Sequence, residues 1–331
     1  MKKLLIIAAS LSLVLAGCAS GGGSKSRVET RKTDVMSDQK DVYIGHFGVT
    51  FITSDSSSSK SQSPMIRHSS ASEYAKAILA AKLTGVPQSR MQTITDKAYQ
   101  DLVKDLEARG YNVLSYQDLQ RKKAWSELDK TDSPYTPSSG LFDSDKRGRT
   151  LFSPSGMPLL FDEEEIKRPF TLGALAEEVG VPVLIASYTV HFAYFDNDAD
   201  YTVNYFQDVP LSGGPSKELS ASVTLGQGIQ VLRKSSLHFV TEGAGSFSDN
   251  GYVWLEDPVI VAGAYGSNED TTSDGTKAAN ALSSFVGLFT GGSTSKTEIS
   301  VVANPDYYEF GALKALNEAN ARLTDGLRPL K

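Results

Sequence analysis

The sequence predicts an α/β fold of the α+β kind: a mixed β-sheet flanked by helices, with a β-meander and a C-terminal amphipathic helix. Three observations support this prediction. An apolar strand pattern at residues 42–52 is followed by an amphipathic helical pattern at 93–109. A second helix-to-strand step occupies residues 171–195, and several short strands then precede a final helical pattern at 310–327.

The composition is that of a globular chain with ample material for a packed core. Of its 331 residues, 40% are apolar and 22% are charged. The formal charge of −6 provides no global positive field, so nucleic acid is not an expected partner. The single cysteine excludes an internal disulfide.

The amino terminus has the order of a bacterial lipoprotein signal. Lys2 and Lys3 precede an apolar run, Leu4–Leu15, that is shorter than the roughly 20 residues of a membrane-spanning helix. The following letters, "LAGC", resemble the bacterial lipobox. That resemblance implies removal of residues 1–17, a thioether-linked diacylglycerol on Cys18, and acylation (palmitate) of its new amino group. The alternative is an ordinary signal peptide that happens to place a cysteine after its cut.

The stretch after the cysteine is interpreted as an acylated flexible tether. Residues 18–40 are small, polar and charged, without an apolar period. Two or three acyl chains hold a protein durably at a membrane, whereas one chain does not. Because Ala19 and Ser20 follow the cysteine in place of aspartate, the resemblance implies the outer membrane, with the mature domain in the periplasm. Display on the cell surface is the alternative.

Residues 41–331 are expected to form a single periplasmic domain. The strand at 42–52 is interrupted by glycines, as at a bulge or a close backbone approach. The serine-rich stretch at 53–64 is expected to be an exposed loop. Residues 71–83 have helical composition, so a helix is expected there.

The clearest helical pattern is at residues 93–109. Thr95 is its predicted N-cap and Gly110 its predicted C-cap. A short strand is expected next, at 111–115. Residues 130–170 are rich in Pro, Ser, Gly and Asp, which indicates an irregular insertion in the domain.

A second helix is expected between a cap at Thr171 and a terminating glycine at Gly180. The strand after it, at 183–195, alternates apolar and polar residues. "FDNDAD", residues 195–200, is expected to turn the chain into a return strand from Tyr201 onward.

The last third of the chain predicts a meander and a closing helix. "SDNG", at residues 248–251, favours a hairpin turn, and residues 277–289 are a short helix candidate. The closing helix places one apolar stripe on a single face: Leu313, Leu316, Ala319 and Leu323. Further strands are expected at 219–232, 235–241, 252–265 and 296–303.

The titratable residues do not form a catalytic or metal-binding pattern. His46, His68, His191 and His238 lack ligand spacing, and His191 is expected to face solvent on the polar side of its strand. The alternating aspartates of residues 196–200 resemble the start of a calcium loop, but an acidic turn is favoured. We therefore expect no catalytic, cofactor-binding or metal-binding residue and no enzymatic activity. Cys18, the lipidation site, is the one functional residue that the sequence predicts.

The order of elements resembles that of the curli-secretion-channel lipoproteins. The helix and strand in "TDKAYQDLVKDLEARGYNVLSYQDLQ" and the later segment "LGALAEEVGVPVLIASYTV" carry the resemblance. It covers residues 41–125 and 170–325, whereas 130–170 departs from the pattern. The resemblance implies a lipid-anchored periplasmic domain that acts in assembly or export, with other envelope proteins and further copies of itself as partners.

The hairpin expected at residues 183–209 is long enough to cross a bilayer, with Tyr188, Val190, Phe192 and Tyr194 as its apolar face. A half-buried periplasmic sheet gives the same pattern and is favoured.

Two functions follow from the sequence. The first is a non-enzymatic, membrane-anchored envelope lipoprotein that supports assembly or secretion of a surface structure through protein–protein contacts as a possible oligomer. The alternative is a monomeric lipid-anchored module that binds a small molecule or glycan through its tyrosine-rich sheet.

Overall fold

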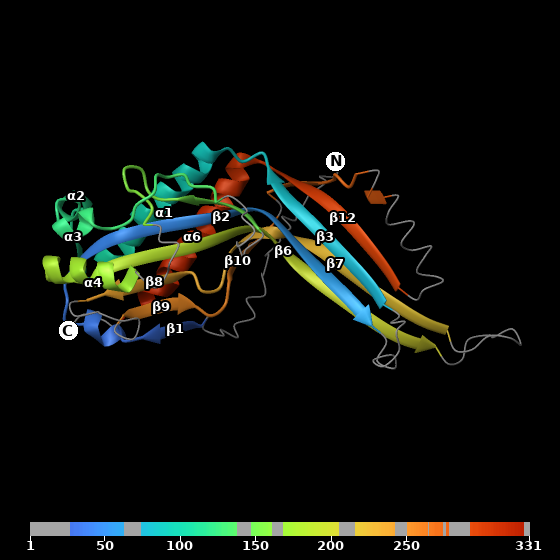
Figure 1. Ribbon diagram of the computed structural model, residues 1–331, viewed down its shortest axis with the longest axis horizontal. Helices are drawn as coiled ribbons and strands as arrows, with labels where there is room; N and C mark the ends of the chain where they lie inside the picture. The colour runs from blue at the N-terminus through green and yellow to red at the C-terminus, as the bar shows by residue number, and fades with distance from the viewer. Residues whose placement is uncertain are drawn as a thin grey trace, which may run out of the picture.

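The computed structural model describes residues 27–62, 74–137, 147–160, 168–204, 216–241, 250–263, 265–273, 276–277 and 292–327. These residues form a helix-covered head and a long group of strands that projects from one side of it (Figure 1). The large, open, mixed sheet and the C-terminal helix confirm the α+β fold. Cys18 lies outside the described residues.

The sheet is built around two long strands that run parallel through its centre. Its main path is β1 (Val28–Arg31), β9 (Gly251–Leu255), β8 (Ser236–Val240), β6 (Val183–Asn204), β2 (Asp41–Gln62), β3 (Tyr74–Thr84), β12 (Gly292–Ala303) and β11 (Gly266–Asp270). β6 also pairs with β7 (Ser216–Val231), which pairs with β10 (Val259–Ala262). β4 (Asn112–Val113) and β5 (Gly148–Phe152) pair with β2.

Helices cover both faces of the sheet in the head. One face packs against α1 (Gln88–Ala108) and α6 (Pro305–Asp325), and the other packs against α2 (Tyr116–Leu119), α3 (Lys123–Ser126) and α4 (Arg168–Val179). Leu184 belongs to the first core, whereas its neighbours Val183 and Ile185 belong to the second. Because successive strand residues point to opposite faces, an uninterrupted apolar run serves both layers.

The two long helices begin earlier than the sequence predicts. α1 starts at Gln88 after Pro87, so Thr95 is inside the helix, where its hydroxyl donates to the carbonyl of Met91 at 2.9 Å. The predicted N-cap at Thr95 is therefore wrong. Gly110 has φ of 92° and follows the end of α1, which confirms its capping role.

α6 starts at Pro305, and the side chain of Asn304 accepts hydrogen bonds from two backbone amides of its first turn. Three members of its predicted apolar stripe are confirmed, because Leu316, Ala319 and Leu323 are fully buried, whereas Leu313 is only partly buried.

Residues 53–62 and 74–84 form a strand pair, and neither the predicted loop nor the predicted helix is present there. The two strands pair antiparallel from Ser54 opposite Lys82 to Gln62 opposite Tyr74. Ser59 is buried on the inner side of this pair, where its hydroxyl donates to the carbonyl of Asp198 at 2.6 Å. Small side chains permit this close approach of strands, and the ladder overrides the helical composition of β3.

β6 continues straight through the predicted turn at residues 195–200 and pairs with β7 as far as Asn204 opposite Ser216. Its apolar face is part of the core: Tyr188, Val190 and Phe192 are 0–2% exposed, and Tyr194 is 36% exposed. This burial supports the interpretation of a half-buried sheet for that face.

Three other segments complete the comparison with the sequence. Residues 28–36 form β1 and the 3-10 helix η1 (Thr33–Met36), with Met36 fully buried, so the fold begins inside the predicted tether. The insertion at 130–170 contains the ordered strand β5, which pairs with β2. The helix α4 begins at Arg168, so Thr171 is inside the helix and the predicted cap there is wrong. Most of the predicted elements at 248–251 and 277–289 lie outside the described residues.

A nearly buried carboxylate fastens α6 to α1. Glu309, 8% exposed, accepts hydrogen bonds from Lys97 at 2.6 Å and from Arg90 at 2.5 Å, both on α1. The hydrogen bond from Lys97 is the largest cause that lowers the pKa of Glu309 below its usual 4.5, and Arg90 adds to it. The charged form of Glu309 is therefore the one that the fold stabilises.

We expect the free energy of unfolding to decrease as the pH falls below about 4.5. In that range the unfolded chain protonates Glu309 while the folded chain still holds it ionised, so protons favour unfolding. Glu309→Gln is expected to be less stable at pH 7 and to show a shallower decrease between about pH 5 and 3 in urea denaturation. Glu318→Gln, an exposed change on the same helix, is the matched control. Identical pH slopes for wild type and Glu309→Gln would contradict the assignment.

Candidate functional site

The main candidate site is an apolar patch where α6 meets β10. Three of its side chains are largely exposed: Ile260 by 51%, Tyr307 by 65% and Phe310 by 69%. Phe310 and Ile260 line a shallow hollow of about 680 Å³ between the helix and the strand. We refer to Ile260, Tyr307 and Phe310 as the α6–β10 patch.

The local structure explains why these side chains point outward. The opposite side of α6 packs into the core through residues such as Tyr308 and Ala312, both fully buried. Tyr307 and Phe310 are consequently left on the solvent side, three residues apart, as neighbours on one helix face. β10 pairs only with β7 among the described strands, so Ile260 stands on an outermost strand.

The patch has the chemistry of a protein contact surface. Charged residues surround its apolar centre, including Lys314 and the ion pair between Arg322 and Glu318 at 2.8 Å. An apolar, aromatic centre with a polar rim is the usual composition of such interfaces. The sequence alone does not predict this site, because the predicted helix begins at residue 310 and leaves Tyr307 outside it, whereas α6 begins at Pro305.

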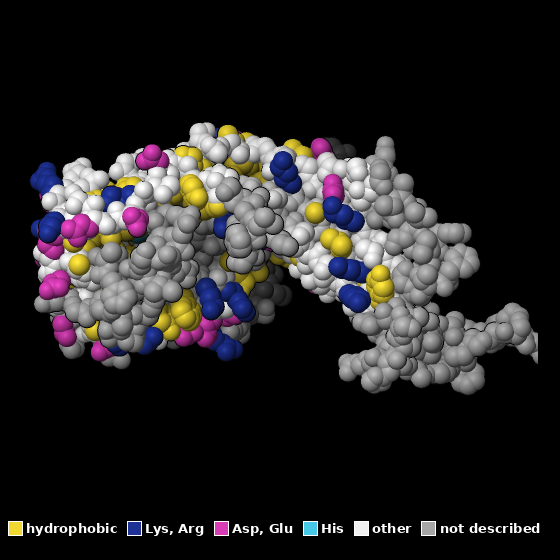
Figure 2. Space-filling view, viewed as in Figure 1, with side chains coloured by type: hydrophobic (Ala, Val, Ile, Leu, Met, Phe, Trp, Pro, Cys, Tyr) yellow, Lys and Arg dark blue, Asp and Glu magenta, His cyan; other side chains and the backbone are white. Residues whose placement is uncertain are grey.

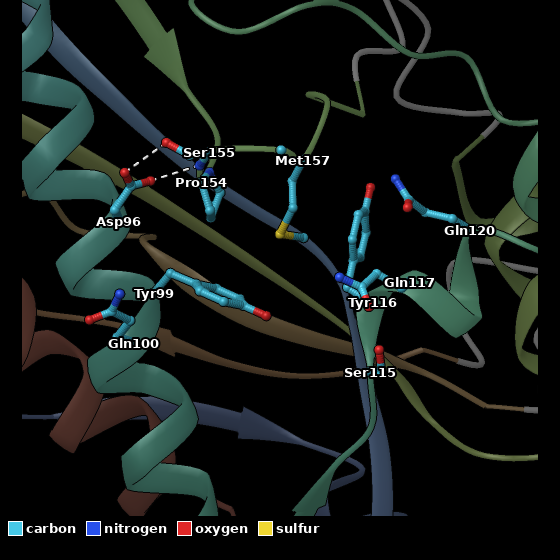
Figure 3. A pocket seen from close by; sticks show the side chains of 11 residues that line it. Asp96, Tyr99, Gln100, Ser115, Tyr116, Gln117, Gln120, Pro154, Ser155 and Met157 are labelled. Carbon is cyan, nitrogen blue, oxygen red and sulfur yellow. Dashed lines mark hydrogen bonds between the residues drawn. The ribbon is translucent and has the colours of Figure 1, made fainter.

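A second hollow, of about 490 Å³, lies between α1, α2 and the turn at residues 153–157 (Figure 3). Asp96 joins α1 to the turn that forms the opposite wall of this hollow. Its carboxylate accepts hydrogen bonds from the backbone amide and the hydroxyl of Ser155 at 2.7 and 2.8 Å. Burial raises the pKa of Tyr116 to about 12, so this phenol stays protonated at neutral pH. Gln117 and Gln120 add exposed amides beside it.

His191 is buried, so the prediction that it faces solvent is wrong. Its Nε2 lies 2.9 Å from the Asp55 carboxylate, and its Nδ1 accepts a hydrogen bond from the amide of Ala193 at 3.0 Å. The register of β6 against β7 shifts between His191 and Ala193, and such a bulge reverses which residues face inward. The pair joins β2 to β6 at the base of the extension.

The other titratable residues are dispersed. His46 is buried, where its Nδ1 accepts from the Leu160 amide at 3.4 Å; His238 lies against the ring of Tyr252; and His68 is outside the described residues. Within the described ranges, no group of three His, Cys, Asp or Glu is placed to hold a metal ion. Asp196 and Asp198 are exposed on a strand.

The chain enters the fold on the side of the extension. β1 runs antiparallel to β9, and Val28 pairs with Leu255. Following the registers from β9 through β8 and β6 to β2 places Val28 near the level of Val49 in β2. The residues of β2 before Val49 belong to the head, and those after Ile52 lead into the extension. The strand β1 therefore runs from the side of the extension toward the head.

None of the described helices combines the length and apolarity needed to cross a membrane. Comparison with protein-family models, with curated proteins and with solved structures finds no match.

Proposed function

We propose that this chain is a non-enzymatic, membrane-anchored envelope lipoprotein that supports assembly or secretion of a surface structure through protein–protein contacts, including contacts with further copies of itself. The observation that carries the proposal is the α6–β10 patch. Ile260 on an outermost strand and Phe310 on α6 line one hollow, and Tyr307 lies on the same face of α6; each of the three side chains is more than half exposed. Such a surface is stabilised when a partner covers it.

The anchoring part of the proposal is supported by the lipobox and by the position of Val28. "LAGC" ends at Cys18, and nine residues separate that cysteine from the first strand of the fold. Because the chain enters on the side of the extension, an anchor on Cys18 would turn the extension toward the membrane and the head away from it.

Cys18→Ala is expected to abolish incorporation of labelled palmitate and to remove the chain from the outer-membrane fraction, because the thioether-linked lipid can form only on the thiol. Labelling in cells followed by membrane fractionation measures both results. Ser24→Ala, in the same segment, is expected to behave like wild type. Unchanged labelling of Cys18→Ala would refute the anchor.

Phe310→Glu is expected to shift the full-length lipoprotein in detergent from oligomer toward monomer, because it places a charge in the apolar centre of the patch. Analytical ultracentrifugation measures the distribution. A contribution of about 2 kcal/mol, typical of a central aromatic residue, corresponds to roughly a 30-fold weaker contact. Lys104→Glu, which places the same carboxylate on an exposed part of α1, is the matched control. A monodisperse wild-type monomer would contradict self-association.

A second candidate function rests on the hollow between α1 and α2. Its size is within the range of small-molecule sites, and its lining combines tyrosine rings with uncharged amides and hydroxyls. That combination suits a neutral polyhydroxyl ligand such as a glycan. The Tyr252 and Trp254 rings elsewhere on the sheet are a weaker choice, because they stack on each other and both donate hydrogen bonds to Glu29.

If the hollow binds glycan, the full chain should bind an N-acetylglucosamine trimer saturably in calorimetry. Removing two amides by Gln117→Ala and Gln120→Ala should lower the affinity about ten-fold, through lost hydrogen bonds of about 1.4 kcal/mol in sum. Tyr307→Ala, which changes an exposed tyrosine outside the hollow, should leave the affinity unchanged. Absence of saturable binding at millimolar concentrations of the trimer would exclude glycan binding as the function of this hollow.

A further inference from the structure

One face of the extension is cationic although the chain as a whole carries −6. The ladders of β2 with β3 and of β3 with β12 place alternate residues on a common outer side, while the other side is buried against small residues and leucines. We refer to this outer side as the lysine face. Its lysines are Lys60, Lys76, Lys82 and Lys296, with Tyr74 and Ile78 between them, and the ladders place Glu298 and Glu269 on the same side at the end nearer the head. Figure 2 shows basic and hydrophobic side chains interspersed on the projecting part of the molecule, with acidic side chains beside them.

The charges of the lysine face are not balanced within the described part of the chain. Lys60 and Lys76 stand directly opposite each other across the β2–β3 ladder, an arrangement that repels. Of the four lysines, Lys296 has a carboxylate partner, Glu298 at 2.7 Å. Among described residues, no carboxylate lies within 4 Å of Lys60, Lys76 or Lys82.

The apolar members of the face sit among the lysines. Tyr74 lies beneath Lys60, whose ammonium is 4.8 Å from the centre of its ring, and Ile78 pairs in register with Lys296. Lysine stems cover apolar surface while their ammonium groups reach outward, and tyrosine is favoured where hydrocarbon meets water. This mixture is suited to the boundary of a bilayer.

The length of chain before the fold limits how far the membrane of the proposed anchor can lie from the head. Ten residue steps lead from Cys18 to Val28, and an extended chain of that length reaches about 33–36 Å at most. Along β2, the eleven steps from the level of Val28, at Val49, to Lys60 rise about 36 Å. A bilayer that holds a lipid on Cys18 therefore lies no farther out than Lys60 when the strands stand upright, and nearer when they tilt.

We propose that the lysine face binds the phosphate-bearing headgroups of an anionic bilayer surface. The proposal deepens the anchoring part of the proposed function and rests on it. The anchor on Cys18 fixes the distance from the membrane, and the lysine face fixes the orientation, because the unbalanced ammonium groups of Lys60 and Lys76 are neutralised at the headgroups. Tyr74, two residues farther out than Lys76, then lies at the boundary with the acyl chains, and Ile78 reaches that boundary when the strands tilt so that the lysine face lies along the bilayer.

The test uses the whole mature chain, residues 18–331, with Cys18→Ser so that no lipid contributes to binding. Flotation measures its binding to vesicles of phosphatidylcholine alone and of phosphatidylcholine with 30 mol% phosphatidylglycerol. Binding is expected only to the anionic vesicles and is expected to weaken as salt is raised. Lys60→Gln together with Lys76→Gln is expected to weaken it about 25-fold, at about five-fold for each lysine. Lys40→Gln with Lys104→Gln, which removes two exposed lysines of the head, is the matched control.

Equal binding to both kinds of vesicle, or equal loss in the two double variants, would overturn the proposal. Failure to bind anionic vesicles would also overturn it and would leave an acidic protein surface as the occupant. The anchor is tested separately by palmitate labelling at Cys18, so a labelled chain with no headgroup preference would reject the lysine face alone.

Discussion

The architecture depends on the change of partner along β2. Its first half lies in the head, parallel to β6, with helices on both faces; its second half leaves the head and pairs with β3. The change falls between Ile52 and Ser54, where the ladders with β6 and β5 end or shift. At that level the Asp55 carboxylate lies 2.9 Å from Nε2 of His191, so a side-chain contact joins β2 to β6 where the backbone ladder between them ends. A rigid junction of this kind lets a long group of strands project from a small head.

The interior of the extension is made of small side chains, and this explains its narrowness. Ser59 and Ser61 are buried opposite Ala77 and Ala75, and the hydroxyl of Ser57 donates to Asn197 at 3.0 Å. Hydroxyl groups that bond to the neighbouring strand satisfy their own polarity, so serine can occupy positions that would otherwise require alanine. The outer side is then free to carry lysines without exposing the interior.

The sequence predicted the parts of the fold that depend on local pattern. The stripe through Leu316 and the cap at Gly110 require only neighbouring residues, and both are confirmed. The strand character of residues 53–62 comes from pairing with β3, which composition cannot reveal because polar serines favour a loop when considered alone. The bulge beside His191 likewise depends on pairing with β7, and the alternation of residues along β6 alone therefore predicted the wrong side for His191. The patch at Phe310 also depends on a distant strand, β10, which supplies Ile260.

The proposed anchor and the proposed contact surface lie at different distances from the bilayer. Ile260 pairs with Gln230, and Gln230 pairs with His191. Since His191 pairs with Ile52, the last residue of β2 in the head ladder, the α6–β10 patch lies at the base of the extension. Lys60 is eight residues farther along β2, about 26 Å from that level. Copies anchored on one bilayer and oriented by their lysine faces would hold their patches in a common plane above it. Confinement to a plane raises the effective concentration of the patches for one another, so a contact that is weak in solution can suffice for assembly at the membrane.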